Sequence, residues 1–184
     1  TSAGTLEVTA TFDQAMPEIV APSRVYTVIL NENYGSNTTS NLTSAYTFGG
    51  YYDQQNGKGN MYYKANGRSN KNWDKVEATT LYAKWTGQEL TLPTKTRKGY
   101  TFEGWYTANG TKVDNKYTPT ANITLYAHWQ INTYTVTYNY SENGGTKASK
   151  NSDSVNYDAN VDLTVTATKN NWKFVGWNTD KTAT

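Results

Sequence analysis

The chain has 184 residues, 14% of them aromatic, with 16 Tyr, 6 Trp, no cysteine and a formal net charge of +2. Its basic residues are scattered, which argues against nucleic acid and against a polybasic membrane patch as partners. Without cysteine, disulfide frameworks, thiolate zinc sites and thiol nucleophiles are excluded. There is no run of 18 apolar residues, so membrane insertion of this segment is not expected. Because the first residue is Thr1, we expect the chain to be a piece of a longer protein.

Strand-like alternation is the main pattern along the chain. Apolar and polar residues alternate over residues 6–12, 123–129 and 161–167, and residues 26–30 form a further strand block. Strands with one buried face give this period of two, and Asn-Gly dipeptides between the blocks suit hairpin turns. No stretch keeps the spacing of an amphipathic helix. The sequence therefore predicts an all-β or β-rich chain of small antiparallel sheet modules with little helix.

Two strings recur along the chain. The first has the form aromatic-x-Phe-x-Gly-aromatic and occupies residues 46–51, 100–105 and 172–177. The second, Thr-Leu-Tyr-Ala-x-Trp, occupies residues 80–85 and 124–129. Repeated strings are typical of tandem modules. The glycine of the first string predicts a β-bulge or a close backbone approach, because glycine inside a regular strand only weakens it.

The strings predict three repeat units. Unit one covers residues 1–85 and carries an insertion at about 53–80, unit two is short and covers 86–129, and unit three covers 130–184 and is truncated at its C-terminal end. Unit two has only a short lead-in before its aromatic string. We therefore expect unit two to rely on a neighbour for an edge strand.

Residues 99–106 and 122–129 resemble the Listeria-Bacteroides repeat family, which is related to the B-repeat of internalins. Residues 134–138 followed by 143–146 resemble the opening strand and turn of the same repeat, and 174–178 its middle. The resemblance implies small β-grasp-like modules in tandem on secreted or cell-wall proteins of bacteria. It implies no catalytic residues and no ligand site.

Catalytic chemistry finds little support in the residues. The single histidine, His128, occupies the position that Lys84 holds in unit one, on the polar face of a strand, so we interpret it as a surface residue. No carboxylate pair recurs in the strings, and the turn at 53–57 lacks the alternating acids of a calcium loop. We expect no enzyme, no cofactor and no metal. The lack of disulfides leaves a Lys–Asn isopeptide bond as a hypothesis, which an intact mass would test.

The recurrent aromatic residues are expected to form the module cores, because a small sheet with few aliphatic residues needs large rings. These core residues are Phe48, Tyr51, Trp85, Phe102, Trp105, Trp129, Phe174 and Trp177. Trp73 has no counterpart in the other units and sits in the polar insertion, near Tyr62 and Tyr63. These three residues are the candidate ligand-binding set.

The leading hypothesis is a non-enzymatic spacer or stalk on the outside of a bacterium, with adhesion as a further role. The alternative is a module that binds carbohydrate or a host-surface protein through the aromatics of the insertion. The sequence does not specify an oligomeric state.

Overall fold

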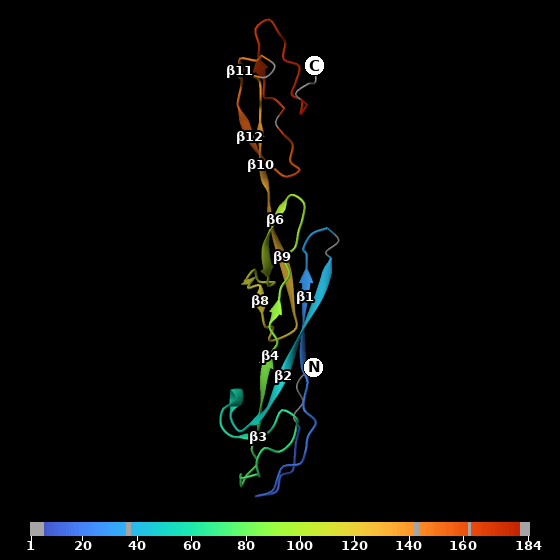
Figure 1. Cartoon of the computed structure of the whole chain (residues 1–184), viewed down its shortest axis with the longest axis vertical. Helices are drawn as coiled ribbons and strands as arrows, with labels where there is room; N and C mark the ends of the chain where they lie inside the picture. The colour runs from blue at the N-terminus through green and yellow to red at the C-terminus, as the bar shows by residue number, and fades with distance from the viewer. Residues whose placement is uncertain (1–5, 36–37, 142–143, 162, 181–184) are drawn as a thin grey trace. The chain divides into compact units, whose positions relative to one another are not determined.

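The computed structural model describes residues 6–35, 38–141, 144–161 and 163–180, and these residues form an all-β chain (Figure 1). The helical element within those ranges is one 3-10 turn, η1 (Gln55–Gly57). The all-β class predicted from the sequence is thus confirmed. Two compact units can be distinguished: one contains the chain up to Pro93 with Gly104–Ala127, and the other contains Thr94–Glu103 with the chain from His128 onward.

Three long strands dominate the largest sheet. β1 (Arg24–Asn31) pairs antiparallel with β2 (Thr39–Tyr52), in a register that runs from Arg24 opposite Tyr46 to Asn31 opposite Thr39. β9 (Ile123–Ile131) pairs with β1 in parallel. The side chains where β1 and β9 meet are fully buried, namely Val28, Leu30, Leu125 and Ala127. These small and branched residues form the centre of the sheet, and β1 and β2 appear as neighbouring long arrows in Figure 1.

The other strands of this sheet are short. They are β3 (Met61–Tyr63), β4 (Tyr82–Gly87), β6 (Tyr100–Tyr106) and β7 (Lys112–Val113). The strand order is β3-β2-β1-β9-β6-β7, and β4 also pairs with β2. Three small antiparallel pairs complete the structure: β5 (Leu90–Thr91) with β8 (Lys116–Tyr117), β10 (Thr133–Thr137) with β12 (Ser152–Asn156), and β11 (Lys147–Ala148) with β13 (Ala167–Thr168).

The glycine of the first aromatic string forms a bulge, as the sequence predicts. Gly50 has φ of 109°, and the pairing of β2 with β4 changes register between Phe48 and Tyr51. A Cβ at Gly50 would overlap the carbonyl oxygen of Tyr63. Gly104 in the second string also has a positive φ, 131°. The bulge lets the strand turn its aromatic residue without losing the flanking pairs.

The expectation of a strand partner from elsewhere in the chain agrees with the pairing of β9. Most of β9 lies within residues 86–129, and its parallel partner β1 lies almost 100 positions earlier, with Val28 opposite Ile123. The sequence predicted antiparallel strands throughout, so this parallel pair makes the sheet mixed and corrects that part of the expectation. A parallel pair needs a long connection between its strands, which short turn signals cannot reveal.

Two of the predicted strands are wrong. Residues 6–12 form no strand, and Leu6 and Phe12 are 63% and 60% exposed. An isolated bridge joins Phe12 to Trp73, and Asp13 has φ of 59°. Alternation by itself does not make a strand, because the backbone also needs a partner to satisfy its hydrogen bonds.

In the other segment, residues 161–167, residue 162 lies outside the described residues and Leu163 is exposed in a turn. Among the described residues of this segment, Ala167 belongs to a strand, β13, and the others lie outside any strand.

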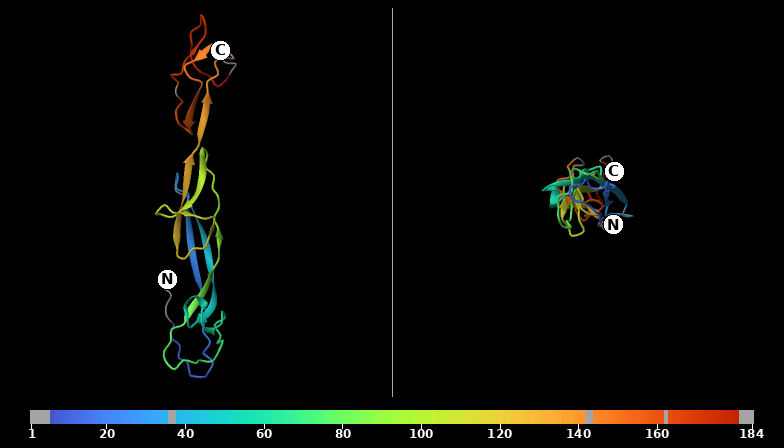
Figure 2. Two further views of the ribbon diagram at one scale, coloured as in Figure 1. Left: turned by 90° about the vertical axis from the view of Figure 1, so that its left-hand side faces the viewer. Right: turned by 90° about the horizontal axis from the view of Figure 1, so that it is seen from below.

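The N-terminal segment instead covers the insertion. Met16, Tyr62 and Tyr63 form a small buried cluster, against which Ala10 and Ile19 pack. In Figures 1 and 2 the blue N-terminal segment and the green loops that follow β2 lie together beyond one end of β2. Residues of the predicted insertion at 53–80 therefore share a small buried cluster with residues 10–19.

Candidate functional site

Aromatic residues of the first and second recurrent strings pack against one another in two pairs. The ring centroids of Phe48 and Trp85 are 5.4 Å apart, and those of Phe102 and Trp129 are 5.2 Å apart. Each pair joins the first string of a repeat to its second string. Such tilted and edge-to-face contacts are the arrangements that aromatic pairs prefer.

The predicted core residues differ in how deeply they are buried. Phe48 and Trp105 are buried, whereas the others are partly buried: Tyr51, Trp85, Phe102, Trp129, Phe174 and Trp177. Phe174 contacts Trp177 with centroids 5.3 Å apart, and Trp177 also packs on Tyr138 at 5.0 Å.

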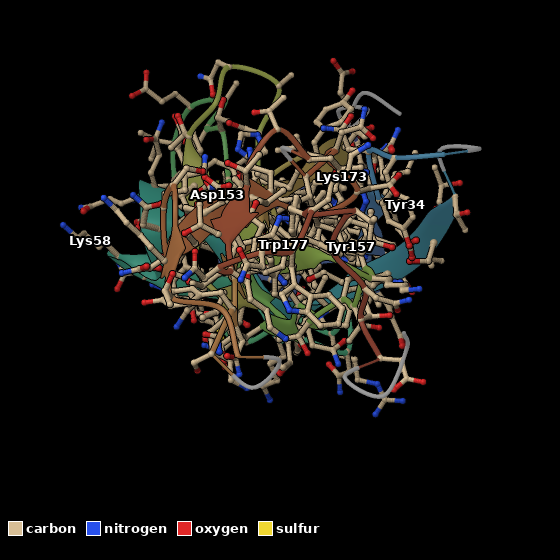
Figure 3. The ribbon with its side chains drawn as sticks, turned by 90° about the horizontal axis from the view of Figure 1, so that it is seen from above. Tyr34, Lys58, Asp153, Tyr157, Lys173 and Trp177 are labelled. Carbon is tan, nitrogen blue, oxygen red and sulfur yellow. The ribbon has the colours of Figure 1, made fainter. Side chains whose placement is uncertain are left out.

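Two indoles make the same hydrogen bond at corresponding positions. Trp105 Nε1 donates to the carbonyl oxygen of Pro93 at 2.7 Å, and Trp177 Nε1 donates to that of Val165, also at 2.7 Å. In both cases the acceptor lies 12 residues earlier in the chain. Trp177 is among the labelled side chains in Figure 3. The bond satisfies the indole N–H of a ring that is otherwise packed against apolar groups.

A basic residue stacks on the aromatic residue that opens the string. The guanidinium carbon of Arg97 lies 3.6 Å from the ring centroid of Tyr100, and Lys169 Nζ lies 4.4 Å from that of Trp172. The backbone N–H of each aromatic residue donates to the carbonyl of its basic partner, at 3.1 and 3.2 Å. Sequence reasoning missed this feature. A basic residue three positions before the aromatic, in two of the three strings, is the signal that could have found it.

The three candidate ligand-binding residues lie in the insertion, but two of them are inside the protein. Tyr62 is 0% and Tyr63 is 2% exposed. Trp73 is partly buried, and its ring packs on Tyr62 with centroids 5.3 Å apart. A sugar could not stack on Tyr62 or Tyr63 in this conformation, because protein atoms already cover them. The sequence could not show this, since the covering residues around Met16 lie in a segment without a clear pattern.

A polar network surrounds the hydroxyl of Tyr62. That hydroxyl donates to Asp74 Oδ1, and Lys71 Nζ donates to Asp74 Oδ2 at 2.5 Å. Nearby, Lys75 Nζ donates to Asp53 Oδ2 at 3.2 Å. Both lysines also lie over the ring of Tyr62, at 5.2 and 5.8 Å. The network fastens residues 71–75 to the loop that begins at Asp53.

The charges of this network are stabilised in their ionised forms. The hydrogen bond from the Asn60 backbone N–H, followed by that from Lys75, lowers the pKa of Asp53, and the bond from Lys71, followed by that from Tyr62, lowers the pKa of Asp74. Hydrogen bonds to Asp74 and Asp53 raise the pKa of Lys71 and Lys75 respectively.

These amines are consequently protonated at neutral pH, which makes them poor nucleophiles. The arrangement suits a structural brace better than a reaction centre.

A shallow hollow lies between η1 and β4. Its lining includes Arg24, Asn56, Tyr82, Lys84 and Trp85. The guanidinium carbon of Arg24 lies 4.6 Å from the Trp85 ring centroid. Two cations, an amide and an exposed tyrosine could contact an anionic or hydroxyl-rich group here.

The described ranges were 6–35, 38–141, 144–161 and 163–180. Among these residues no group of three or more His, Cys, Asp or Glu side chains is placed to hold a metal ion. His128 is partly buried on β9. In the same part of the chain, no helix has the length and apolar character that would let it cross a bilayer.

Comparison with known proteins gave the following matches. The family model described as the Listeria-Bacteroides repeat domain matches residues 62–128 and 134–184. Internalin H of Listeria monocytogenes is 38% identical over 112 residues, which cover 59% of this chain and 19% of that protein. A protein of Evansella cellulosilytica named "Putative membrane protein" is 36% identical over 103 residues, 53% of this chain and 14% of that protein. The chain thus spans less than a fifth of the length of these relatives. No solved structure matches significantly.

Proposed function

Because the chain belongs to the Listeria-Bacteroides repeat family, we propose that it is a non-enzymatic repeat segment of a bacterial surface protein and serves there as a spacer or stalk. Its place in that protein would be extracellular, on the cell wall or secreted. The similarity to internalin H supports a surface location, and the proposal extends it to this chain. The β-grasp-like module that the family resemblance implies is part of the same proposal.

One observation carries the proposal: the residues that recur between the repeats make internal contacts. The first and second strings meet through Phe48 with Trp85 and through Phe102 with Trp129. The indole N–H groups of Trp105 and Trp177 each donate a hydrogen bond to the backbone carbonyl of the residue 12 positions earlier. A repeat whose recurrent residues build its own core can be duplicated without any requirement on a ligand, which suits a spacer.

The spacer role can be tested by display on a bacterial surface. The chain is placed between a cell-wall anchor and a folded reporter domain, and binding of a large antibody to the reporter is measured on intact cells. We expect access to fall when the chain is deleted and to be kept when exposed side chains such as Val20, Val76 and Val175 are changed to Ser. Access that depends on those side chains, or that is unchanged on deletion, would contradict the spacer role.

A binding role is the second candidate, and the hollow beside β4 favours it. Arg24, Lys84 and Tyr82 offer charged and hydroxyl contacts there, and the 53–80 insertion supplies Asn56. The partner would be a glycan or a host-surface protein. Trp73 with Tyr62 and Tyr63, the original candidate set, would serve this role only with rearrangement of the cluster.

The binding role is tested by a glycan array probed with the labelled chain. Binding that Lys84→Ala removes and Lys58→Ala keeps would place the ligand at the hollow, because Lys58 is exposed on the same loop but does not line it. Binding that Trp73→Ala alone removes would place the ligand at the insertion. If the labelled chain binds no glycan on the array, the spacer role remains the proposed function.

A further inference from the structure

The parallel pairing of β1 with β9 decides how this pair responds when the chain is stretched. Val28 lies opposite Ile123 and Asn31 lies opposite Tyr126. A pull on the chain before β1 draws that strand toward its own start, whereas a pull on the chain after β9 draws that strand toward its own end. The two strands are therefore loaded in opposite directions along one axis. The evenly spaced hydrogen bonds of a parallel pair then bear the force together, in shear.

Apolar side chains bury the same pair. Val28 and Leu30 of β1 and Leu125 and Ala127 of β9 are all 0% exposed. A hydrogen bond is electrostatically stronger in such surroundings than in water. The pair that a pull loads in shear therefore lies at the buried centre of the sheet.

Two asparagine side chains close the ends of the β1–β9 pair. At its start, Asn122 Oδ1 accepts a hydrogen bond from the backbone N–H of Thr27 at 2.9 Å. At its end, Asn33 Nδ2 donates to the carbonyl oxygen of Ala127 at 3.4 Å. Both bonds lie just beyond the paired residues. Asn122 and Asn33 therefore extend the hydrogen bonding between the two segments past the strand register itself.

The antiparallel pairs respond differently to the same pull. In the β10–β12 pair Thr133 lies opposite Asn156, and force along the chain enters the pair through these two residues. Both points lie at the same end of the pair, so its hydrogen bonds are loaded one after another, as in a zipper. Most residues of the two strands are also exposed. The β1–β2 pair opens in the same way once β9 has separated, because Arg24 lies opposite Tyr46 at the loaded end.

We propose that the parallel β1–β9 pair, closed by Asn122 and Asn33, is the force-bearing element of this chain and keeps its unit folded under tension. The inference rests on the spacer role, because a stalk that is anchored at one end is stretched when its other end is held. Under a rising force the β10–β12 pair yields first. The β1–β9 pair yields at a severalfold higher force, and its rupture then releases the segment between the two strands.

Single-molecule stretching of the full chain between handles at its two ends tests this element. We expect a strong event whose gain in length matches the segment between β1 and β9, at about 3.3–3.6 Å per residue. Because the chain has no cysteine, cross-links can be placed at chosen positions. A disulfide between Ile29→Cys and Thr124→Cys, which lie opposite each other, should remove most of this gain until it is reduced. A disulfide between Thr135→Cys and Ser154→Cys should instead act on the weak β10–β12 event alone.

The direction of loading distinguishes a shear element from a merely stable fold. Handles at Asn31→Cys and Tyr126→Cys, which lie opposite each other, pull the same pair apart across its strands. The pair should then open at a severalfold lower force than in end-to-end pulling. Forced unfolding is governed by the rate of unfolding along the pulled direction, so a difference between the two directions is independent of the equilibrium stability.

Matched asparagine variants test the ends of the pair. Asn122→Ala removes the acceptor of the Thr27 N–H and should lower the force of the strong event in end-to-end pulling. Asn115→Ala is the control, because Asn115 is also exposed but lies outside the β1–β9 pair, and it should leave that force unchanged.

Three results would overturn the proposal. They are equal forces in the two loading directions, a strong event that the disulfide between positions 29 and 124 does not shorten, and equal forces for Asn122→Ala and Asn115→Ala. Any of them, combined with the expected antibody access in the surface-display experiment, would refute the force-bearing element and leave the spacer role standing. A strong event of the expected length, combined with access that is unchanged on deletion, would refute the spacer role alone.

Discussion

At the scale of the residue, the tryptophans of the aromatic strings combine a large apolar ring with one hydrogen bond. Trp105 is buried and its Nε1 donates to Pro93, while Trp177 does the same to Val165. A buried carbonyl or N–H without a partner costs about 1–3 kcal/mol. Tryptophan at this position thus fixes the approach of the segment 12 residues earlier.

Replacing Trp105 with Phe should therefore destabilise its unit. The change keeps an aromatic ring but removes the N–H donor and leaves a gap, so we expect a loss of about 2–4 kcal/mol in the free energy of unfolding. Urea denaturation followed by far-UV circular dichroism measures it. Trp172→Phe is the matched control, because Trp172 is largely exposed, and it should change stability by about 0.5 kcal/mol or less. Equal midpoints for the two variants would contradict this account.

The polar network around Tyr62 predicts loss of structure in acid. The pKa values of Asp53 and Asp74 are lowered in the folded chain. The two carboxylates therefore contribute to stability above the unfolded pKa of about 3.9, and this contribution is lost as the pH falls through their folded-state pKa values. Near-UV circular dichroism should report loosening of the tyrosine cluster below about pH 4. Asp74→Asn should weaken this acid dependence, and Asp114→Asn, an exposed residue outside the network, should preserve it. Identical acid profiles for these two variants would argue against the network.

The same cluster predicts loss of structure in alkali. Burial raises the pKa of Tyr62 and Tyr63, and Asp74 and Asp53 raise the pKa of Lys71 and Lys75. A group whose pKa is raised by folding stabilises the fold fully below its unfolded-state pKa, here about 10. It loses this contribution as the pH rises through its folded-state pKa. Tyrosinate absorbance near 295 nm should therefore show a late fraction that appears together with loss of near-UV signal. A single early transition of all tyrosines would refute this.

At the scale of the element, a strand forms where alternation and a partner coincide. Residues 123–129 alternate, lie beside β1, and form β9 as predicted. Residues 6–12 alternate equally well but find only one bridge, Phe12 to Trp73. Whether an alternating segment becomes a strand therefore depends on whether a partner strand lies beside it, and the residues of the segment alone do not encode that.

The bulge at Gly50 predicts a sharp difference between neighbouring glycines. Gly50→Ala would place a Cβ against the Tyr63 carbonyl and force alanine to a φ of 109°, so we expect a loss of about 2–4 kcal/mol. Gly49→Ala, one residue earlier, has ordinary φ and meets only the flexible Lys84 side chain, and should cost about 1 kcal/mol or less. Thermal unfolding of both variants measures the difference. Similar losses would show that the bulge is not a constraint.

At the scale of the whole molecule, residues distant in sequence share one core. Met16 from the N-terminal segment packs with Tyr62 and Tyr63 from the insertion, and Tyr63 also donates a hydrogen bond to the Pro17 carbonyl at 3.0 Å. The insertion would otherwise expose two large aromatic rings. Residues 10–19 therefore act as the cover of the insertion.

Deleting residues 1–21 should loosen the insertion while keeping the largest sheet. We expect faster hydrogen exchange at 61–75 and new cleavage there by limited proteolysis, with protection of β1 and β9 unchanged, because local stability follows buried contacts. Val20→Ala is the control, since this side chain is largely exposed. Unchanged exchange at 61–75 after the deletion would show that the cover contributes nothing.

The sequence by itself determined the all-β class, the repeat strings, the family and the bulge at Gly50, because period-two alternation and recurrence are properties of the chain read in order. The tertiary structure decided the parallel pairing of β1 with β9, the burial of Tyr62 and Tyr63 and the covering role of Met16. Each of these features depends on which distant segments meet in the fold. The physical reason is that backbone groups need hydrogen-bond partners and aromatic rings need packing partners, and both come from segments far apart in the sequence. The aromatic residues could therefore be predicted as a set, while the distinction between core rings and surface rings such as Trp172 required their three-dimensional neighbours.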